Sequence, residues 1–286
     1  MHPKTIKPNI NTITMNRVVV GFDFSSGSAY AVDLSIDIAN RWQSDIRLVY
    51  VKEKKEDEGP IRAEIEQRIA GVAHLLHNIK MEYVIRQGSP ADELTAQARE
   101  DNASLLIVGT HGMSGMKTNM LGRNSYKTIE QSAVPVLIVR EDFNFNKNLE
   151  TIVVPIDNSE DTRQKVADAA LFAKHFDSTI HLLGLYTSTV PDIRNLVNSY
   201  VKMVERYLDK NEIKYKTVLR DAEKNVTTAT LKYADEVKAD MIAIMTEQEK
   251  TFNSLILGNY AQQMINQSKI PVLTVRPRIV EANTVN

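Results

Sequence analysis

One loop of the chain places three of its four glycines, together with polar side chains, at a spacing that suits an anion. It reads Gly109-x-x-Gly112, nine further residues, and then Gly122, with Asn124 and Ser125 close behind. Glycines let a backbone pass close to a ligand because no Cβ stands in the way. A helix opening at Gly122 would point its free N–H groups at a phosphate, and the Ser125 hydroxyl would add a donor. The loop therefore predicts a phosphate cradle.

Two other phosphate-binding motifs do not fit this loop. The dinucleotide fingerprint G-x-G-x-x-G, which normally follows the first strand of a βαβ unit, is absent from this sequence. A Walker A loop needs glycine directly before a Lys-Thr pair, but Met116 precedes Lys117 and Thr118. Taken singly, a glycine after a strand more often serves a turn, and a loop lysine such as Lys117 is more often solvated. The combination in one loop is what favours a ligand.

Catalytic and metal chemistry have little support in the sequence. His111 lies between the first two glycines, but no acidic residue or nucleophile is positioned to act with it. His74 and His77 show no metal-ligand spacing. The chain has no cysteine, which excludes disulfides, zinc ribbons, Fe–S clusters and thiol nucleophiles. We therefore expect no catalytic residue and no protein metal site.

Short apolar runs that alternate with amphipathic stretches must position the loop. The runs are largely apolar without strict alternation, as in strands covered on both faces. Two stretches place their apolar residues on one helical face, and two more helices should begin at Ser89-Pro90 and after Gly122. The strands are expected at 17–22, 46–51, 81–86, 105–109 and 136–140, and the helical faces comprise Ala29, Val32, Ile36 and Ala39, and Ile61, Ile65, Ile69, Val72, Leu76 and Ile79. This β-α alternation predicts a doubly wound parallel sheet with helices on both faces, which binds ligands beyond the carboxyl ends of its strands.

The chain is a tandem duplication. The segment RVVVGFD, which ends at Asp23, recurs as TIVVPID, which ends at Asp157, 134 residues later. The first half ends in AVPVLIVR and the second in KIPVLTVR. The second half repeats the strands near 151–156, 180–185, 215–220, 241–245 and 272–276. We expect an extension at 1–16, a first domain at 17–140, a polar linker at 141–150, a second domain at 151–278 and a tail at 279–286.

Composition excludes several classes of partner. Thirty-five Lys and Arg nearly balance 36 Asp and Glu, and 43% of the 286 residues are hydrophobic. That balance argues against a basic nucleic-acid binder and against a disordered acidic tail. No run approaches the ~20 apolar residues that span a bilayer. The first sixteen residues are polar and interrupted by Pro3 and Pro8, unlike a signal peptide. We expect a cytoplasmic protein.

The arrangement G-x-x-G-x9-G, thirteen residues before Pro135-Val136, resembles the ATP-binding motif of the universal stress protein family. The resemblance covers nearly the whole chain twice, at 17–140 and 151–276. A strand that ends in Gly21-Phe22-Asp23, the GSP turn at 88–90 and the PVLIV strand agree with it. It implies two five-stranded Rossmann-like domains of the adenine nucleotide alpha hydrolase-like type, and a stress-response module that binds ATP, with Mg²⁺ as an open question.

The resemblance also implies roles for individual residues. Gly21, Phe22 and Asp23 would sit beside the nucleoside, Val51 and Val108 around the adenine, Gly109 and Gly112 at the ribose and phosphates, and Gly122, Arg123, Asn124 and Ser125 on the phosphate chain. Arg123 departs from the family, which usually has Ser or Thr there. Its guanidinium would either pair with phosphate or remain solvated. Asp23 could equally cap the next helix, sharing that role with Ser25 or Ser26.

The second copy differs from the first in the loop that corresponds to the glycine motif. Aligning Gly258 with Gly122 puts Met245 in the place of Gly109 and Gln248 in that of Gly112. The copy also gains Glu247 and Glu249, and Ala261 replaces Ser125. Added Cβ atoms obstruct backbone approach, and carboxylates that face the pocket would repel a polyphosphate. We expect one ATP per chain, in the first domain, and a degenerate site in the second.

The strands at Pro135-Val136 and Pro271-Val272 would leave exposed sheet edges that invite pairing. In the family such strands commonly form a dimer contact, so the two domains should pair as an intramolecular pseudo-dimer, with a homodimer also possible. For function, the leading hypothesis is a nucleotide-binding regulatory or sensor protein. The alternatives are a structural or interaction protein without nucleotide, and a weak ATPase, which ranks third because no base or Mg²⁺-binding carboxylate pair is evident.

Overall fold

The structure, a computed structural model, describes residues 10, 13–110, 122–140, 143, 148–222, 225–246, 248–251 and 254–277. His111, Gly112, Lys117 and Glu247 therefore lie outside the described residues. The first half comprises β1 (Arg17–Gly21), α1 (Ser26–Trp42), β2 (Asp45–Lys52), α2 (Glu58–Val72), the 3₁₀ turn η2 (Ala73–Leu75), β3 (Met81–Gln87), α3 (Pro90–Glu100), β4 (Leu105–Gly109), α4 (Arg123–Gln131) and β5 (Val136–Val139). The second comprises β6 (Thr151–Ile156), α5 (Lys165–Phe176), β7 (Thr179–Tyr186), α6 (Pro191–Lys210), β8 (Tyr215–Asp221), α7 (Val226–Glu236), β9 (Met241–Met245), β10 (Gln248–Thr251), β11 (Ser254–Leu257), α8 (Asn259–Gln267) and β12 (Val272–Val275).

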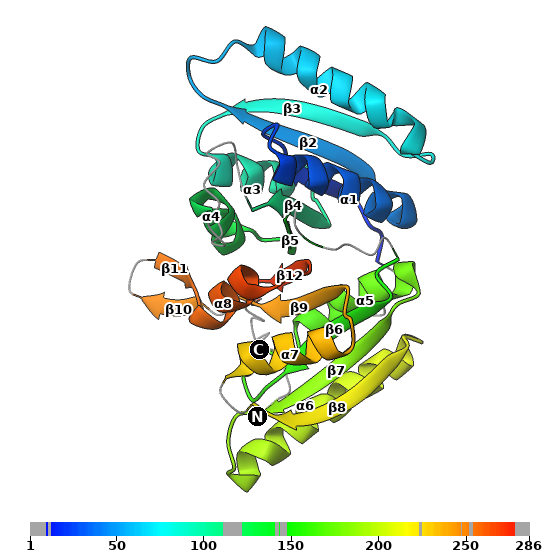
Figure 1. Ribbon diagram of the computed structural model, residues 1–286, viewed down its shortest axis with the longest axis vertical. Coiled ribbons are helices and arrows are strands. Elements are labelled where there is room, and N and C mark those ends of the chain that lie inside the picture. Colours follow the sequence, from blue (N-terminus) through cyan, green and yellow to red (C-terminus); the bar gives the residue numbers. More distant parts are fainter. Residues whose placement is uncertain are drawn as a thin grey trace, which may run out of the picture.

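Each half forms a five-stranded parallel sheet, and the two sheets join into one. The strand order is β3-β2-β1-β4-β5-β12-β9-β6-β7-β8, so each half has the same order from edge to seam. At the seam β5 and β12 pair antiparallel, with Leu137 opposite Leu273. Figure 1 shows the first half above this seam and the second half below it. The predicted fold class is confirmed, and the two strands expected at sheet edges pair with each other within the chain.

The core lies on both faces of this sheet. One apolar cluster packs α1 and α5 against the strands, and it includes Trp42 and Phe172. The other packs α4 and α8, and it includes Ile129 and Met264. Both clusters contain residues from both halves, and all four residues of β5 and of β12 are buried. The two halves therefore bury apolar surface against each other as well as within themselves.

The structure corrects one predicted helix. The apolar face from Ile61 to Ile79 predicts one helix over that whole range. In the structure, α2 ends at Val72 and a 3₁₀ turn follows. The side chain of Asn40 on α1 holds the exit: its amide nitrogen donates to the Leu75 carbonyl and its oxygen accepts from the His77 N–H, both at 2.8 Å. Ile79 is buried, but it lies just before β3.

The hairpin β10–β11 is not predicted by the sequence pattern. Its strands pair antiparallel from Gln248 opposite Leu257 to Thr251 opposite Ser254. It occupies the stretch that corresponds to the glycine loop of the first half. Alignment with that loop predicts no strand here, although the apolar run Ser254–Leu257 suits one.

Candidate functional site

A cavity of about 340 Å³ opens at the carboxyl edge of the first half, within the range of small-molecule sites. It lies between β1 and β4, where the strand order reverses and where ligands bind in such sheets. Its lining consists of Gly21, Phe22, Asp23, Ser25, Ser28, Val51, Pro90, Leu94, Val108, Gly109, Thr110, Gly122, Arg123, Asn124, Ser125 and Thr128. Ten of the eleven predicted site residues are in that set, and the eleventh, Gly112, lies outside the described residues.

The N-terminus of α4 forms one end of the cavity. Gly122 is the N-cap, with extended backbone and no side chain to cap the helix, and no acidic residue lies in the first turn. The first helical bond runs from the Tyr126 N–H to the Gly122 carbonyl, at 3.1 Å. Helix geometry therefore leaves the N–H groups of Arg123, Asn124 and Ser125 without helical acceptors. N–H groups without helical acceptors, together with the helix dipole, make this end of the cavity suitable for an anion.

The Ser125 hydroxyl is already engaged. Its oxygen donates to the Gly109 carbonyl at 3.0 Å and so ties the start of α4 to the end of β4. From the sequence, this hydroxyl is expected to donate to a ligand. In the structure its proton points at Gly109, so a ligand would meet the lone pairs of the oxygen.

Gly109 has a packing role that the sequence did not reveal. A Cβ added there would lie 2.6 Å from the Gly27 carbonyl carbon and 2.9 Å from the Ser28 nitrogen. Real Cβ atoms do not approach backbone so closely, so the first turn of α1 can rest on the end of β4 only if residue 109 is glycine. This glycine shapes the cavity by letting α1 approach.

Asp23 organises the turn between β1 and α1. One carboxylate oxygen accepts from the Ser25 N–H at 3.1 Å and from the Ser25 hydroxyl at 2.5 Å. The Ser25 hydroxyl oxygen in turn accepts from the Ser28 N–H and caps α1. The capping alternative for Asp23 is thus realised indirectly, through Ser25, while the Asp23 carboxylate also borders the cavity.

An apolar slot completes the cavity. Leu94 on α3, Val51 on β2 and Val108 on β4 provide its aliphatic surface. Gly21 adjoins this surface closely, because a Cβ there would lie 3.2 Å from the nearest Leu94 methyl carbon and would require a small shift of Leu94. Flat, apolar groups fit such a surface.

Six lining residues are not among the predicted site residues, namely Ser25, Ser28, Pro90, Leu94, Thr110 and Thr128. For two of them, the sequence predicts a structural role but no contact with a ligand. The pattern predicts Ser25 only as a helix cap and Pro90 only as a helix start. Leu94 lies one turn after Pro90 and is buried, so the helical period of α3 also points to it.

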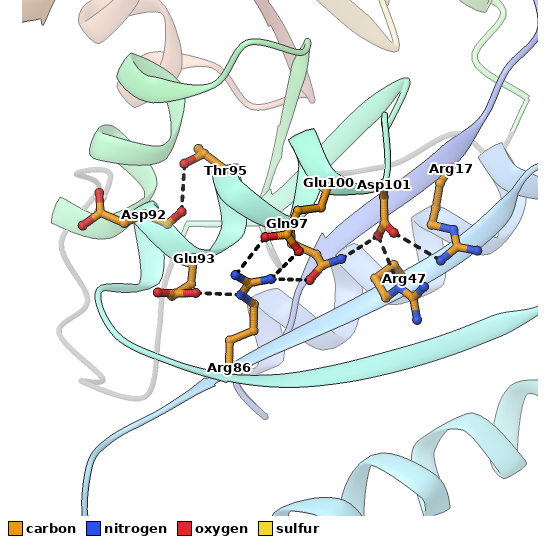
Figure 2. Close-up of polar contacts among 9 residues, drawn as sticks. All are labelled: Arg17, Arg47, Arg86, Asp92, Glu93, Thr95, Gln97, Glu100 and Asp101. Atoms are coloured by element: carbon orange, nitrogen blue, oxygen red, sulfur yellow. Dashed lines mark hydrogen bonds and ion pairs between the residues drawn. The ribbon is translucent and has the colours of Figure 1, made fainter.

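Ion pairs hold α3, which carries one wall of the cavity, against the sheet (Figure 2). From β3, Arg86 binds Glu93 at 2.6 Å, Gln97 at 2.7 Å and Glu100 at 2.8 Å. Hydrogen bonds to Glu100 and Glu93 raise the pKa of Arg86, and the bond to Arg86 lowers the pKa of the Glu100 carboxyl. Charge-assisted bonds are stronger than neutral ones, so this network fixes the orientation of α3.

A second set of ion pairs anchors the end of α3. Asp101 accepts from Arg17 on β1 at 3.4 Å and from Arg47 on β2 at 3.2 Å (Figure 2). These bonds hold the C-terminal end of α3 against β1 and β2.

The second half keeps the turn but changes the surroundings. Asp157 accepts from the Ser159 N–H at 2.9 Å and hydroxyl at 2.5 Å, which reproduces the geometry at Asp23. Met245 stands where Gly109 stands in the first half, and residues 160–164 form turns, so that α5 begins only at Lys165. A side chain at the end of β9 is incompatible with the close helix approach seen over Gly109. The turn alone explains why Asp157 is retained.

The N-terminus of α8 nevertheless matches that of α4. The N-cap Gly258 has φ −62° and ψ 153°, against −64° and 151° at Gly122. The backbone groups that suit an anion are therefore present in both halves. The halves differ in what surrounds those groups.

Two absences hold for the part of the chain that the structure describes. Within it, no group of three or more His, Cys, Asp or Glu side chains is placed to hold a metal ion. Among the same residues, no helix has both the length and the apolar character to cross a membrane.

The model of the universal stress protein family matches the chain twice, at residues 14–140 and 148–276. The chain therefore belongs to that family, with two of its domains in tandem. Universal stress protein YxiE of Bacillus subtilis is 33% identical over 151 residues, which cover 44% of this chain and 99% of that protein.

Solved structures agree on the fold. A universal stress protein from Archaeoglobus fulgidus has a TM-score of 0.72 at 19% identity and covers 92% of this chain and 98% of its own. A universal stress protein in complex with cAMP is 28% identical, covers 45% of this chain and 99% of its own, and has a TM-score of 0.38. That protein holds a nucleotide; at so low a TM-score, the likeness does not bear on the ligand of this chain.

Proposed function

We propose that this chain binds one ATP, in the cavity of its first domain, and acts as a cytoplasmic regulatory or sensor protein. The observation that carries the proposal is the joining, in one cavity, of an uncapped helix N-terminus and an apolar slot. A nucleotide presents those two chemistries, a polyanion and a flat base, at opposite ends.

The residues present fit such a ligand. The phosphates would lie at the free N–H groups of α4, beside the exposed guanidinium of Arg123. The base would lie against Val51, Leu94 and Val108. Asp23 is the only carboxylate among the described lining residues, so little negative charge opposes the phosphates.

Binding, more than turnover, suits this set of groups. The described lining residues include no histidine and no lysine, and only the one carboxylate. A general base needs a positioned partner, and the Asp23 carboxylate is already engaged by the Ser25 N–H and hydroxyl. A bound nucleotide that changes what the protein contacts is therefore the function that the site supports best.

The test is to purify the protein, denature it and identify the released nucleotide by chromatography. We expect roughly one ATP per chain, lost in Gly122→Val and retained in Gly258→Val. Both glycines are N-caps with extended backbone, and among the described residues a Cβ at Gly122 would meet the Thr110 carbonyl oxygen alone, at 3.4 Å. The valine therefore fits the fold, at a capping cost of about 1 kcal/mol, while its methyl groups crowd the anion end.

The two variants change equivalent N-caps, but Gly122 is exposed and Gly258 is buried, so the thermal midpoint of each variant is measured together with its nucleotide content. Absence of released nucleotide, together with no shift of the thermal midpoint on adding ATP, would refute the proposal and favour an interaction protein without nucleotide. Equal loss of nucleotide in both variants would show that Gly122→Val acts on stability and not on the site.

A further inference from the structure

Two of the helices that begin at the cavity, α1 and α4, contact the second half of the molecule at their other ends. α1 begins beside the capping Ser25, and α4 begins at the N-cap Gly122; both caps line the cavity. At their other ends, each helix contacts an element of the second half. The two contacts lie on opposite faces of the sheet, one in each apolar cluster.

The end of α1 packs on α5. The Trp42 ring lies 4.8 Å from that of Phe172, centroid to centroid, and the Arg41 guanidinium lies 4.6 Å from the centre of the Phe176 ring. His175 Nδ1 lies 3.2 Å from the Arg41 carbonyl oxygen. This end of α1 is therefore fixed by aromatic packing across the two halves.

The end of α4 is held by a more specific contact. Glu130 Oε1 accepts from the backbone N–H of Leu257 at 3.0 Å. On the preceding turn, the Tyr126 hydroxyl accepts from the Asn266 side chain at 3.1 Å. Leu257 is 1% exposed and Glu130 is half-buried, so the bond between them is partly buried. β11 packs along α4, and the two lie next to each other across the seam in Figure 1.

Leu257 belongs to the element that distinguishes the two copies. It is the last residue of the β10–β11 hairpin, which stands where the first half has its glycine loop. The segment that the second half has in place of a phosphate loop thus contacts the helix whose N-terminus forms the anion end of the first site.

The stability of α4 depends on such contacts. The helix has nine residues, so it is about 13 Å long, and isolated helices of that length are marginal in water. A carboxylate in the last turn is also unfavourable beside the negative end of the helix dipole. The N–H of Leu257 offsets that cost with a charge-assisted bond.

We propose that Glu130 is a positioning residue for the nucleotide site, through which the second half sets the placement of α4 and so the affinity for ATP. The proposal rests on ATP binding in the first half. It gives the second copy a role, because that copy holds the helix of the competent site.

The sign of the effect separates positioning from simple charge. Glu130 lies on the same short helix as the anion site, so removing its carboxylate should by charge alone leave ATP binding unchanged or strengthen it. Positioning makes the opposite prediction. A weaker affinity after the loss of a negative charge therefore reports the loss of a held geometry.

The experiment measures ATP affinity by isothermal titration calorimetry in the full-length protein. We expect Glu130→Ala to bind ATP about tenfold more weakly than the wild type. Glu130→Gln keeps an oxygen acceptor for the Leu257 N–H and should stay within about twofold of the wild type. The matched control is Gln131→Ala, an exposed neighbour on α4, which should bind like the wild type.

Hydrogen exchange provides a readout that a merely structural role would not move. In the wild type, ATP should slow exchange at the Leu257 amide, which lies outside the cavity lining, and in Glu130→Ala it should not. If Glu130→Ala does not fold, this wild-type comparison with and without ATP decides the matter. If the exchange rate of the Leu257 amide is the same with and without ATP, the inference is overturned.

The outcomes separate this inference from the proposed function. A wild type that binds no ATP would overturn both. A wild type that binds ATP, with Glu130→Ala binding it equally or more tightly, would overturn the inference alone.

Discussion

The two halves of the molecule share their strand order, the aspartate–serine turn after their first strand and the backbone at the N-termini of α4 and α8, yet they differ at one strand end. β4 ends in Gly109, on which the first turn of α1 rests, and β9 ends in Met245, after which α5 starts later. The comparison shows that a glycine in a ligand motif can act by admitting a helix. It also shows that the same helix N-terminus can be present in both halves while the residues around it differ.

The two halves can also be compared in the polar contact between their second strand and the helix that packs on it. In the first half, Arg47 on β2 pairs with Asp101. At the equivalent place in the second half, His181 on β7 is buried and its Nδ1 lies 2.9 Å from the Tyr233 hydroxyl. Both halves also join the edge strand to this helix by an ion pair, Arg86–Glu100 in the first and Arg220–Glu236 in the second. The halves therefore differ at this one position, where an ion pair in the first half is replaced by a histidine–tyrosine contact in the second.

The largest expected effect tests the strand end. Gly109→Ala should lower the free energy of unfolding by about 1–3 kcal/mol and weaken ATP binding at least tenfold, because its Cβ would displace the first turn of α1. Urea denaturation and calorimetry measure the two effects. The control is Gly71→Ala, where the Cβ meets nothing within 4 Å and the helix should gain about 0.5–1 kcal/mol. Gly109→Ala behaving like Gly71→Ala would remove the packing explanation.

An intermediate effect tests the shared turn. Ser25 caps α1, so Ser25→Ala should cost about 1 kcal/mol. Ser159 makes the same bonds to its aspartate, but α5 begins only at Lys165, so Ser159→Ala should cost about half as much or less. Paired urea midpoints measure the difference. Equal costs would mean that the turn, and not the helix cap, is what the serine stabilises.

The smallest effect tests the buried histidine. Burial, and next the charge of Lys216, lower the pKa of His181. The unfolded chain therefore binds a proton near the ordinary histidine value of about 6.5 while the folded chain does not, so stability should fall as the pH drops below that value. His181→Phe should flatten the fall in unfolding free energy between about pH 7 and pH 5, although His175, whose pKa burial also lowers, keeps part of it. An unchanged slope would contradict this assignment.

The sequence predicted the parts of the molecule that depend on local pattern. Apolar runs and their spacing located the ten strands of the sheet, and the repeat of RVVVGFD as TIVVPID placed the two halves. Helix ends are harder to predict from sequence. The end of α2 at Val72 depends on bonds from Asn40, a residue distant in sequence. The hairpin β10–β11 is not predicted, because alignment matches its residues with the glycine loop of the first half, where no strand is expected.

Prediction of the site divides in the same way. The residues that follow the strands are predicted to lie together because the topology brings strand ends together, and those that the structure describes line one cavity. The reason for Gly109 was not found, because its neighbour Gly27 lies on another element and contacts it only in the fold. Likewise, the donor of Ser125 is consumed by a carbonyl that the sequence does not place.

The most direct test of the account is to count nucleotides on the intact chain. Native mass spectrometry of the purified protein in excess ATP should show a single bound nucleotide per chain, and Gly122→Val should show none. Two nucleotides per chain would contradict the account, because the second half would then bind ATP despite Met245, and a chain that stays free of nucleotide would contradict it as well.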